Sequence, residues 1–104
     1  MPNLTAGFRS AALLRQHHLK HHQEFWGLTE AEYERQADMF LGGPRDQDTQ
    51  ECIRSNGDTL RYNTRTDELG VLASDGFIRT YMRANPARHS QPTNLDYFLA
   101  ECAQ

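Results

Sequence analysis

The chain has 104 residues, of which 38% are hydrophobic, and a formal net charge of -3. This length suits one domain with a modest core, because domains usually take roughly 100 to 200 residues. The negative net charge excludes a broad basic field as the source of any nucleic-acid affinity, so basic surface has to be local. Arginines gather in the second half of the chain and predict one cationic face: Arg54, Arg61, Arg65, Arg79, Arg83 and Arg88.

The sequence lacks the common signatures of membrane insertion and of cysteine chemistry. No apolar run approaches the roughly 18 residues of a membrane span, and no basic segment followed by an apolar one opens the chain. We therefore expect no membrane-spanning segment. Cys52 and Cys102 form no CxxC motif, so neither a zinc knuckle nor a disulfide scaffold is indicated. The simplest interpretation is two buried or idle thiols.

Two helices are expected first. From Thr5 to about Glu24, apolar residues recur at the spacing of one helical face. In the second helix, Thr29 and Glu32 form a capping box, and the run "GGP" at 42–44 ends the element.

Four short strands follow, separated by turn residues. They are "QECIRS", "DTLRYN", "ELGVLA" and "FIRTYMR", and Asn56-Gly57 is a strong hairpin signal between the first two. Links this short allow only an antiparallel meander. Thr93 can cap a last short helix or turn over "NLDYFLAEC".

This order predicts a single α+β domain over residues 1–104, with helices at about 5–41, a sheet at about 50–83 and a closing segment at 84–104. The two N-terminal helices should pack on the four-stranded antiparallel meander as its only cover. A cleft should form where the first helix meets one face or edge of the sheet.

The stretch "HHLKHH" at 17–22 holds four of the five histidines. The pairs His17/His21 and His18/His22 could each offer two imidazoles to a metal ion, but a site needs further ligands and HExxH is absent. We therefore predict no metal site, with a histidine-rich metal-binding domain as an alternative. His21 falls at the edge of the apolar stripe, where partial burial suits a histidine to proton transfer. A satisfied structural histidine explains the same position equally well.

Strand arginines are the second candidate group. Alternation places Arg79, Tyr81 and Arg83 on one face of their strand, and Thr80 on the other. A strand arginine beside hydroxyl and amide groups, such as Arg61, can bind phosphate through two N–H groups. Cross-strand ion pairs on a solvated face are the alternative. With histidine, lysine, threonine and tyrosine, these residues suffice for metal-free RNA cleavage, in which the 2′-hydroxyl is the nucleophile.

Three segments carry a family resemblance: "HHLKHHQEFWGLTEAEYERQADMFLGGP", "NGDTLRYNTRTDELGVLASDGFIRTYMRANP" and "PTNLDYF". From about His17 to Phe98 the chain resembles the C-terminal toxin domains of large bacterial surface proteins, including filamentous-haemagglutinin-like and contact-dependent growth inhibition effectors. These domains are similar to the BECR ribonuclease fold of barnase, EndoU, colicin D and RelE-type toxins. The resemblance implies metal-independent RNA cleavage without a cofactor, often of tRNA, leaving a cyclic phosphate. It also implies a cognate immunity protein, delivery as the tail of a larger secreted or surface protein, and action in the cytoplasm of a target cell.

The resemblance also implies site residues. Lys20-His21 match the family's K-H, which makes His21 the candidate general acid or base, and His22 stands where the family has glycine, so the choice between the two histidines is open. Arg79 and Thr80 alternate faces, so both can join one site only if the strand bulges or twists there. The catalytic candidates are His21, His22, Arg61, Arg79, Thr80 and Tyr97, and the substrate-binding candidates are His17, Lys20, Tyr62 and Arg83.

A non-catalytic module that binds protein or RNA is the alternative function. The acidic balance and the absence of a sharp catalytic signature favour it. Salt-dependent RNA binding without turnover would distinguish it from an enzyme.

Overall fold

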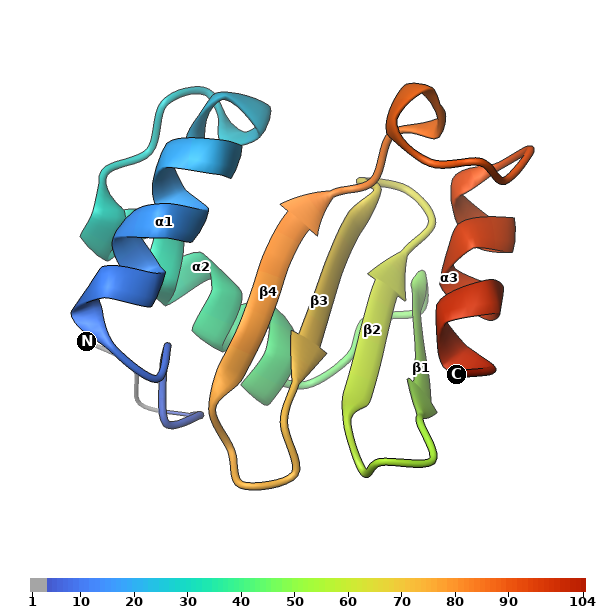
Figure 1. Ribbon diagram of the computed structural model, residues 1–104, viewed down its shortest axis with the longest axis horizontal. Helices are drawn as coiled ribbons and strands as arrows, with labels where there is room; N and C mark the ends of the chain where they lie inside the picture. Colours follow the sequence, from blue (N-terminus) through green and yellow to red (C-terminus); the bar gives the residue numbers. More distant parts are fainter. Residues whose placement is uncertain (1–3) are drawn as a thin grey trace.

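The computed structural model describes residues 4–104 and confirms the α+β architecture (Figure 1). Two N-terminal helices precede a four-stranded sheet, and a third helix closes the chain. The elements are α1 (Ala11–His21), the 3-10 turn η1 (His22–Phe25), α2 (Glu30–Gly42), β1 (Thr49–Ile53), β2 (Thr59–Asn63), β3 (Glu68–Leu72), β4 (Ile78–Arg83), the 3-10 turn η2 (Pro86–Arg88) and α3 (Asn94–Cys102). No helix within residues 4–104 is long and apolar enough to cross a membrane.

The sheet is the expected antiparallel meander, with strand order β1-β2-β3-β4. Gly57 and Gly76 occupy the tight turns β1–β2 and β3–β4 with φ of 93° and 94°, a left-handed conformation that glycine adopts without steric cost. The capping box of α2 is present, because Thr29 Oγ1 accepts from the Glu32 backbone N–H and the Glu32 carboxylate accepts from the Thr29 backbone N–H. Thr93 caps α3 as predicted.

The first helix is shorter than the sequence predicts. Residues 6–8 instead run parallel to the edge of β4, where Phe8 bridges Ile78 and the Ala6 N–H donates to the Gly76 carbonyl at 2.8 Å. Gly7 adopts φ of 75°, which breaks the helical path, and Ser10 then caps α1. The predicted start at Thr5 is therefore wrong. At the other end the helix tightens into η1 after His21, so Glu24 lies in a 3-10 turn.

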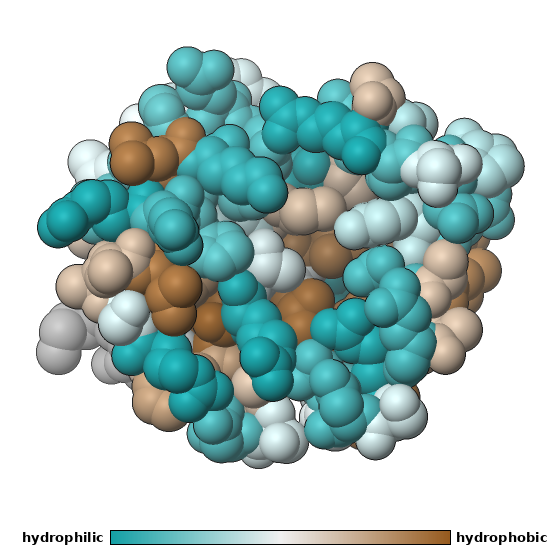
Figure 2. Space-filling view, viewed as in Figure 1, coloured by the Kyte–Doolittle hydropathy of each residue, from teal (hydrophilic) through white to brown (hydrophobic). Residues whose placement is uncertain are grey.

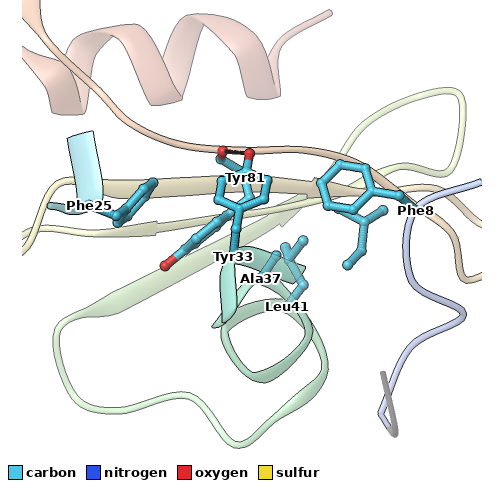
Figure 3. Packing of buried hydrophobic residues seen from close by; sticks show 7 residues of the cluster. Phe8, Phe25, Tyr33, Ala37, Leu41 and Tyr81 are labelled. Atoms are coloured by element: carbon cyan, nitrogen blue, oxygen red, sulfur yellow. Dashed lines mark hydrogen bonds between the residues drawn. The ribbon is translucent and has the colours of Figure 1, made fainter. Parts of the chain in front are cut away.

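Two hydrophobic cores lie on opposite faces of the sheet. The first packs α1, η1 and α2 on one face, and Figure 3 shows its aromatic centre, where the Tyr33 hydroxyl donates to the Tyr81 carbonyl. The second lies under α3, where Phe98 stacks on Tyr62 at 5.7 Å. The expectation that the helical pair alone covers the sheet is therefore wrong. The middle strands bury apolar side chains on both faces, so a second cover is needed.

A disulfide bond links two elements of the second core, β1 and α3. Cys52 of β1 bonds Cys102 of α3 across 50 residues of sequence. The interpretation of these residues as idle thiols is wrong, because α3 folds back over β1 and brings the two side chains together.

Strand β4 carries an irregularity that changes which side chains share a face. Val71 pairs with Thr80 and Leu72 with Ile78, so Arg79 is an extra residue without a register partner. Ile78 and Tyr81 consequently pack in the same core. The strict alternation predicted for this strand is therefore wrong. The strand contains the bulge without which Arg79 and Thr80 could not join one site.

Candidate active site

A cleft lies where α1 ends beside β4, as the sequence predicts. A cavity of about 350 Å³ opens between the end of α1, the end of β4, the loop after it and α3. A neighbouring cavity of similar volume shares four of its lining residues: Glu24, Arg83, Asn85 and Arg88. Figure 2 shows this side of the molecule, where hydrophilic side chains surround a recessed hydrophobic patch.

His21 is the buried imidazole of the cleft. It is the last residue of α1 and 4% exposed, and its Nδ1 lies 2.8 Å from Glu24 Oε2. A carboxylate accepts hydrogen bonds, so it favours the tautomer that carries the proton on Nδ1. Nε2 has no hydrogen-bond partner among residues 4–104. The second ring nitrogen is therefore left for proton exchange with a bound molecule.

Glu24 holds three elements together around His21. Its Oε1 accepts from the backbone N–H of Arg83 at 2.9 Å, and its Oε2 accepts from Arg88 Nη1 at 3.0 Å. The 3-10 turn η1 directs this side chain back toward the end of β4. The sequence interpretation did not single out Glu24. Its position three residues after His21, on the same helical side, is the signal that could have identified it.

Three cations line the cleft around this one carboxylate. Lys20 is exposed and forms no ion pair with any residue of 4–104. Arg83 donates through Nε to the Thr66 carbonyl at 3.0 Å, which leaves its charge without a carboxylate partner within the same range. Arg88 is 61% exposed and pairs with Glu24. The cleft therefore has a local positive balance on a negatively charged chain, which suits an anionic ligand.

Tyr97 of α3 forms the opposite wall together with His89, which the sequence interpretation left outside the site. The two rings stack at 4.4 Å and 9°. His89 is held by Asn94 Oδ1 at Nε2 (2.9 Å) and by the Gln91 N–H at Nδ1 (3.2 Å), so neither nitrogen is free for proton transfer. Burial raises the pKa of Tyr97, and Glu101 adds to this effect. Tyr97 therefore keeps its proton at neutral pH and can donate it in a hydrogen bond.

His17 and Arg79 lie beside this cleft and line a separate cavity of about 210 Å³. The His17 ring is 6.1 Å from His21 and 5.3 Å from Phe8. Burial lowers the pKa of His17, and the neighbouring His21 and Lys20 add to the effect. Arg79 is 52% exposed and donates to Asp58 at 3.0 Å. Thr80 is half-buried on the opposite face of β4 from Tyr81 and lines neither cavity.

Three further predicted site residues, besides His17, Arg79 and Thr80, are not brought to the cleft. Arg61 points to the face that α2 covers, where Nη1 donates to the Phe40 and Gly43 carbonyls at 3.1 and 2.7 Å. It caps the C-terminal end of that helix. Tyr62 lies in the second core and donates to Asp67 at 2.7 Å, and burial raises its pKa. His22 stacks on His18 at 5.0 Å instead of lining the cavity. Of these two adjacent histidines, His21 lines the cleft and His22 does not.

The described residues contain no ready-made metal centre. Within 4–104, no three His, Cys, Asp or Glu side chains are grouped so that they could hold an ion. The alternative His18/His22 pair has no third ligand, and His18 Nε2 is already bonded to the Leu28 carbonyl.

Comparison with known proteins identifies a similar fold. No protein-family model and no curated protein sequence matches the chain. Among solved structures, the chain is similar to a ribonuclease from Escherichia coli complexed with its inhibitor protein, with a TM-score of 0.53 and 18% sequence identity. The alignment covers 85% of this chain and 95% of that one. At this identity, the likeness concerns the fold.

Proposed function

We propose that the chain is a ribonuclease that cleaves RNA without a metal ion, with His21 as its proton-transfer group. The observation that carries the proposal is the buried His21 imidazole, held by Glu24 in a cleft lined by Lys20, Arg83 and Arg88. The fold shared with a ribonuclease supports it. A nucleophile is not required from the protein, because RNA supplies its own 2′-hydroxyl.

The proposed reaction is an in-line transfer. The 2′-oxygen forms a bond to the adjacent phosphorus as the bond to the 5′-oxygen breaks, giving a 2′,3′-cyclic phosphate and a 5′-hydroxyl. One proton leaves the 2′-hydroxyl and another reaches the 5′-oxygen. His21 Nε2 exchanges one of these protons, and solvent water exchanges the other. Glu24 then stabilises the imidazolium that forms while Nε2 holds a proton.

Positive charge in the cleft would stabilise the phosphorane, the five-coordinate phosphorus species through which the transfer passes. Lys20 and Arg83 have no carboxylate partner within residues 4–104, so each can neutralise the added negative charge. Tyr97, with its raised pKa, would donate a hydrogen bond to a phosphate oxygen. Arg79 and Thr80, on the neighbouring part of β4, would contact RNA beyond the scissile phosphate. Arg61 and Tyr62 have no part in this proposal.

An inhibitor protein is the proposed partner. The similar ribonuclease is complexed with its inhibitor protein, and a cognate immunity protein would cover the same kind of cleft here. Acidic side chains on that partner would pair with Lys20, Arg83 and Arg88, and charge complementarity would speed association. From the family resemblance we further propose tRNA as the substrate, with delivery into a target cell as the tail of a larger secreted protein.

The test is cleavage of total tRNA by the purified chain in EDTA. His21→Ala should lower the cleavage rate by about 100-fold or more, the usual contribution of a general acid or base. His22→Ala is the matched control, because His22 is the adjacent histidine but packs on His18, and it should keep near-normal activity. If the wild-type chain binds tRNA without cutting it, the chain is a binding module and not a ribonuclease. Equal rates for the two variants would remove His21 from the site.

A further inference from the structure

One large aromatic side chain beside the cleft is left almost uncovered. Trp26, the chain's single tryptophan, is 85% exposed. It follows η1 with φ of 59°, in the left-handed region that bulky residues rarely adopt, and Gly27 continues the turn with φ of 77°. In this conformation the indole is exposed, whereas the preceding Phe25 is buried in the adjacent core. Costly outliers of this kind concentrate at ligand-binding sites.

The indole is connected to the cleft through Arg83. The Arg83 guanidinium carbon lies 5.1 Å from the centre of the indole ring, in cation–π contact. The same arginine lines both cavities of the cleft and a third cavity of about 280 Å³ that contains Trp26. Gln36, Thr66 and Glu68 also line this third cavity and provide hydrogen-bonding groups.

We propose that Trp26 and Arg83 form a subsite that stacks a nucleobase next to the phosphate held in the cleft. The proposal rests on the proposed ribonuclease function and adds a specific contact with the substrate. Arg83 covers one face of the indole, and the high exposure of Trp26 leaves the other face open. A base fits this face, since stacking on aromatic side chains is how single-stranded nucleic acids are bound without strict sequence choice. The unpaired charge of Arg83 favours a nucleotide over an apolar peptide, because a phosphate lies within one nucleotide of every base.

The single tryptophan makes the subsite directly observable. An eight-nucleotide oligo(dA), which lacks 2′-hydroxyls and is not cleaved, should quench the intrinsic fluorescence of Trp26 as it binds. An abasic deoxyribose-phosphate chain of the same length should bind more weakly and leave the emission nearly unchanged. Equal quenching by both chains would overturn the proposal, because it would show that phosphate alone produces the signal.

Variants test the energy of the contact. Trp26→Ala should weaken binding of oligo(dA) by about 10-fold, within the usual range for one base stacked on an aromatic ring. Its binding of the abasic chain should stay at the wild-type level, and Trp26→Phe should restore part of the lost affinity. Met39→Ala is the matched control. Met39 is also an exposed apolar residue, but it lies on α2 and does not line the cavity that Trp26 lines. Equal affinities of Trp26→Ala and Met39→Ala for oligo(dA) would refute the subsite.

Parallel tRNA cleavage separates this proposal from the ribonuclease assignment. Quenching without cleavage would keep the base subsite and reject the catalysis, whereas cleavage without quenching would do the opposite. An alternative role for the exposed indole is a contact between two copies of the chain, which sedimentation tests. A wild-type dimer that Trp26→Ala dissociates would assign the indole to that contact and overturn the proposal.

Discussion

The histidines of this chain differ in chemistry because their partners differ. One ring nitrogen of His21 is hydrogen-bonded to the Glu24 carboxylate, and the other has no hydrogen-bond partner within residues 4–104. Both nitrogens of His89 are bonded, so it serves as a stacking surface for Tyr97. His17 has a buried Nδ1 without a hydrogen-bond partner within residues 4–104. The residue type alone indicates that proton transfer is possible, whereas the partners determine which ring can perform it.

His17 should make folding stability depend on pH. Burial lowers its pKa below the ordinary 6.5, so the unfolded chain binds a proton more readily than the folded chain. The free energy of unfolding should therefore fall as pH drops from 6.5 toward the folded pKa, with no contribution from His17 above 6.5. In urea unfolding between pH 7.5 and 5.5, His17→Gln should show a smaller loss than wild type. A loss of equal or greater size in the variant would contradict this assignment.

At the scale of elements, helix ends and a strand bulge determine where the arginine side chains lie. The sequence predicts the strand that holds Arg61 and its alternation, but the covering element determines whether the guanidinium meets solvent or a helix. Here α2 ends over that face, and Arg61 donates to the carbonyls of Phe40 and of the C-cap Gly43. In β4 the bulge at Arg79 shifts the alternation and puts Ile78 in the core with Tyr81.

Arg61→Ala should destabilise the fold without removing activity. The change leaves the carbonyls of Phe40 and of the C-cap Gly43 without their donor, and Glu51 without its ion-pair partner. Hydrogen bonds of a charged donor typically contribute about 2 kcal/mol. Urea unfolding measures the loss, and tRNA cleavage per folded molecule should remain normal. Arg88→Ala is the contrasting variant: this exposed arginine should matter little to stability but lower cleavage. An Arg61→Ala protein of normal stability and no activity would return Arg61 to the site.

At the scale of the molecule, one sheet carries two cores and the cleft forms at their shared edge. The first core fixes α1 and η1, which supply His21 and Glu24, and the second fixes α3, which supplies Tyr97. The walls of the cleft therefore belong to different faces of the sheet. Their relative position depends on how firmly α3 is attached.

The Cys52–Cys102 disulfide should provide much of that attachment. It closes a loop of 50 residues, and a loop of this length corresponds to about 4 kcal/mol of stabilisation, since the cross-link restricts the unfolded chain. Dithiothreitol should lower the Tm of the wild type, and a Cys52→Ser/Cys102→Ser variant should melt at the reduced value with or without reductant. An unchanged Tm in wild-type protein with both thiols shown to be reduced would disprove this role.

The sequence by itself determined the elements whose causes are local. The capping box of Thr29 and Glu32, the turn glycines and the cap at Thr93 act between residues a few positions apart, so they can be identified without knowing the fold. The Lys20-His21 match left two adjacent histidines as candidates, of which His21 lines the cleft.

Only the tertiary structure decided how distant residues meet. Glu24 reaches the backbone of Arg83 across 59 positions, the cysteines bond across 50, and Arg61 is covered because α2 crosses its face of the sheet. Such contacts depend on which face each layer covers, and helical or strand periodicity does not specify the layer that will lie opposite.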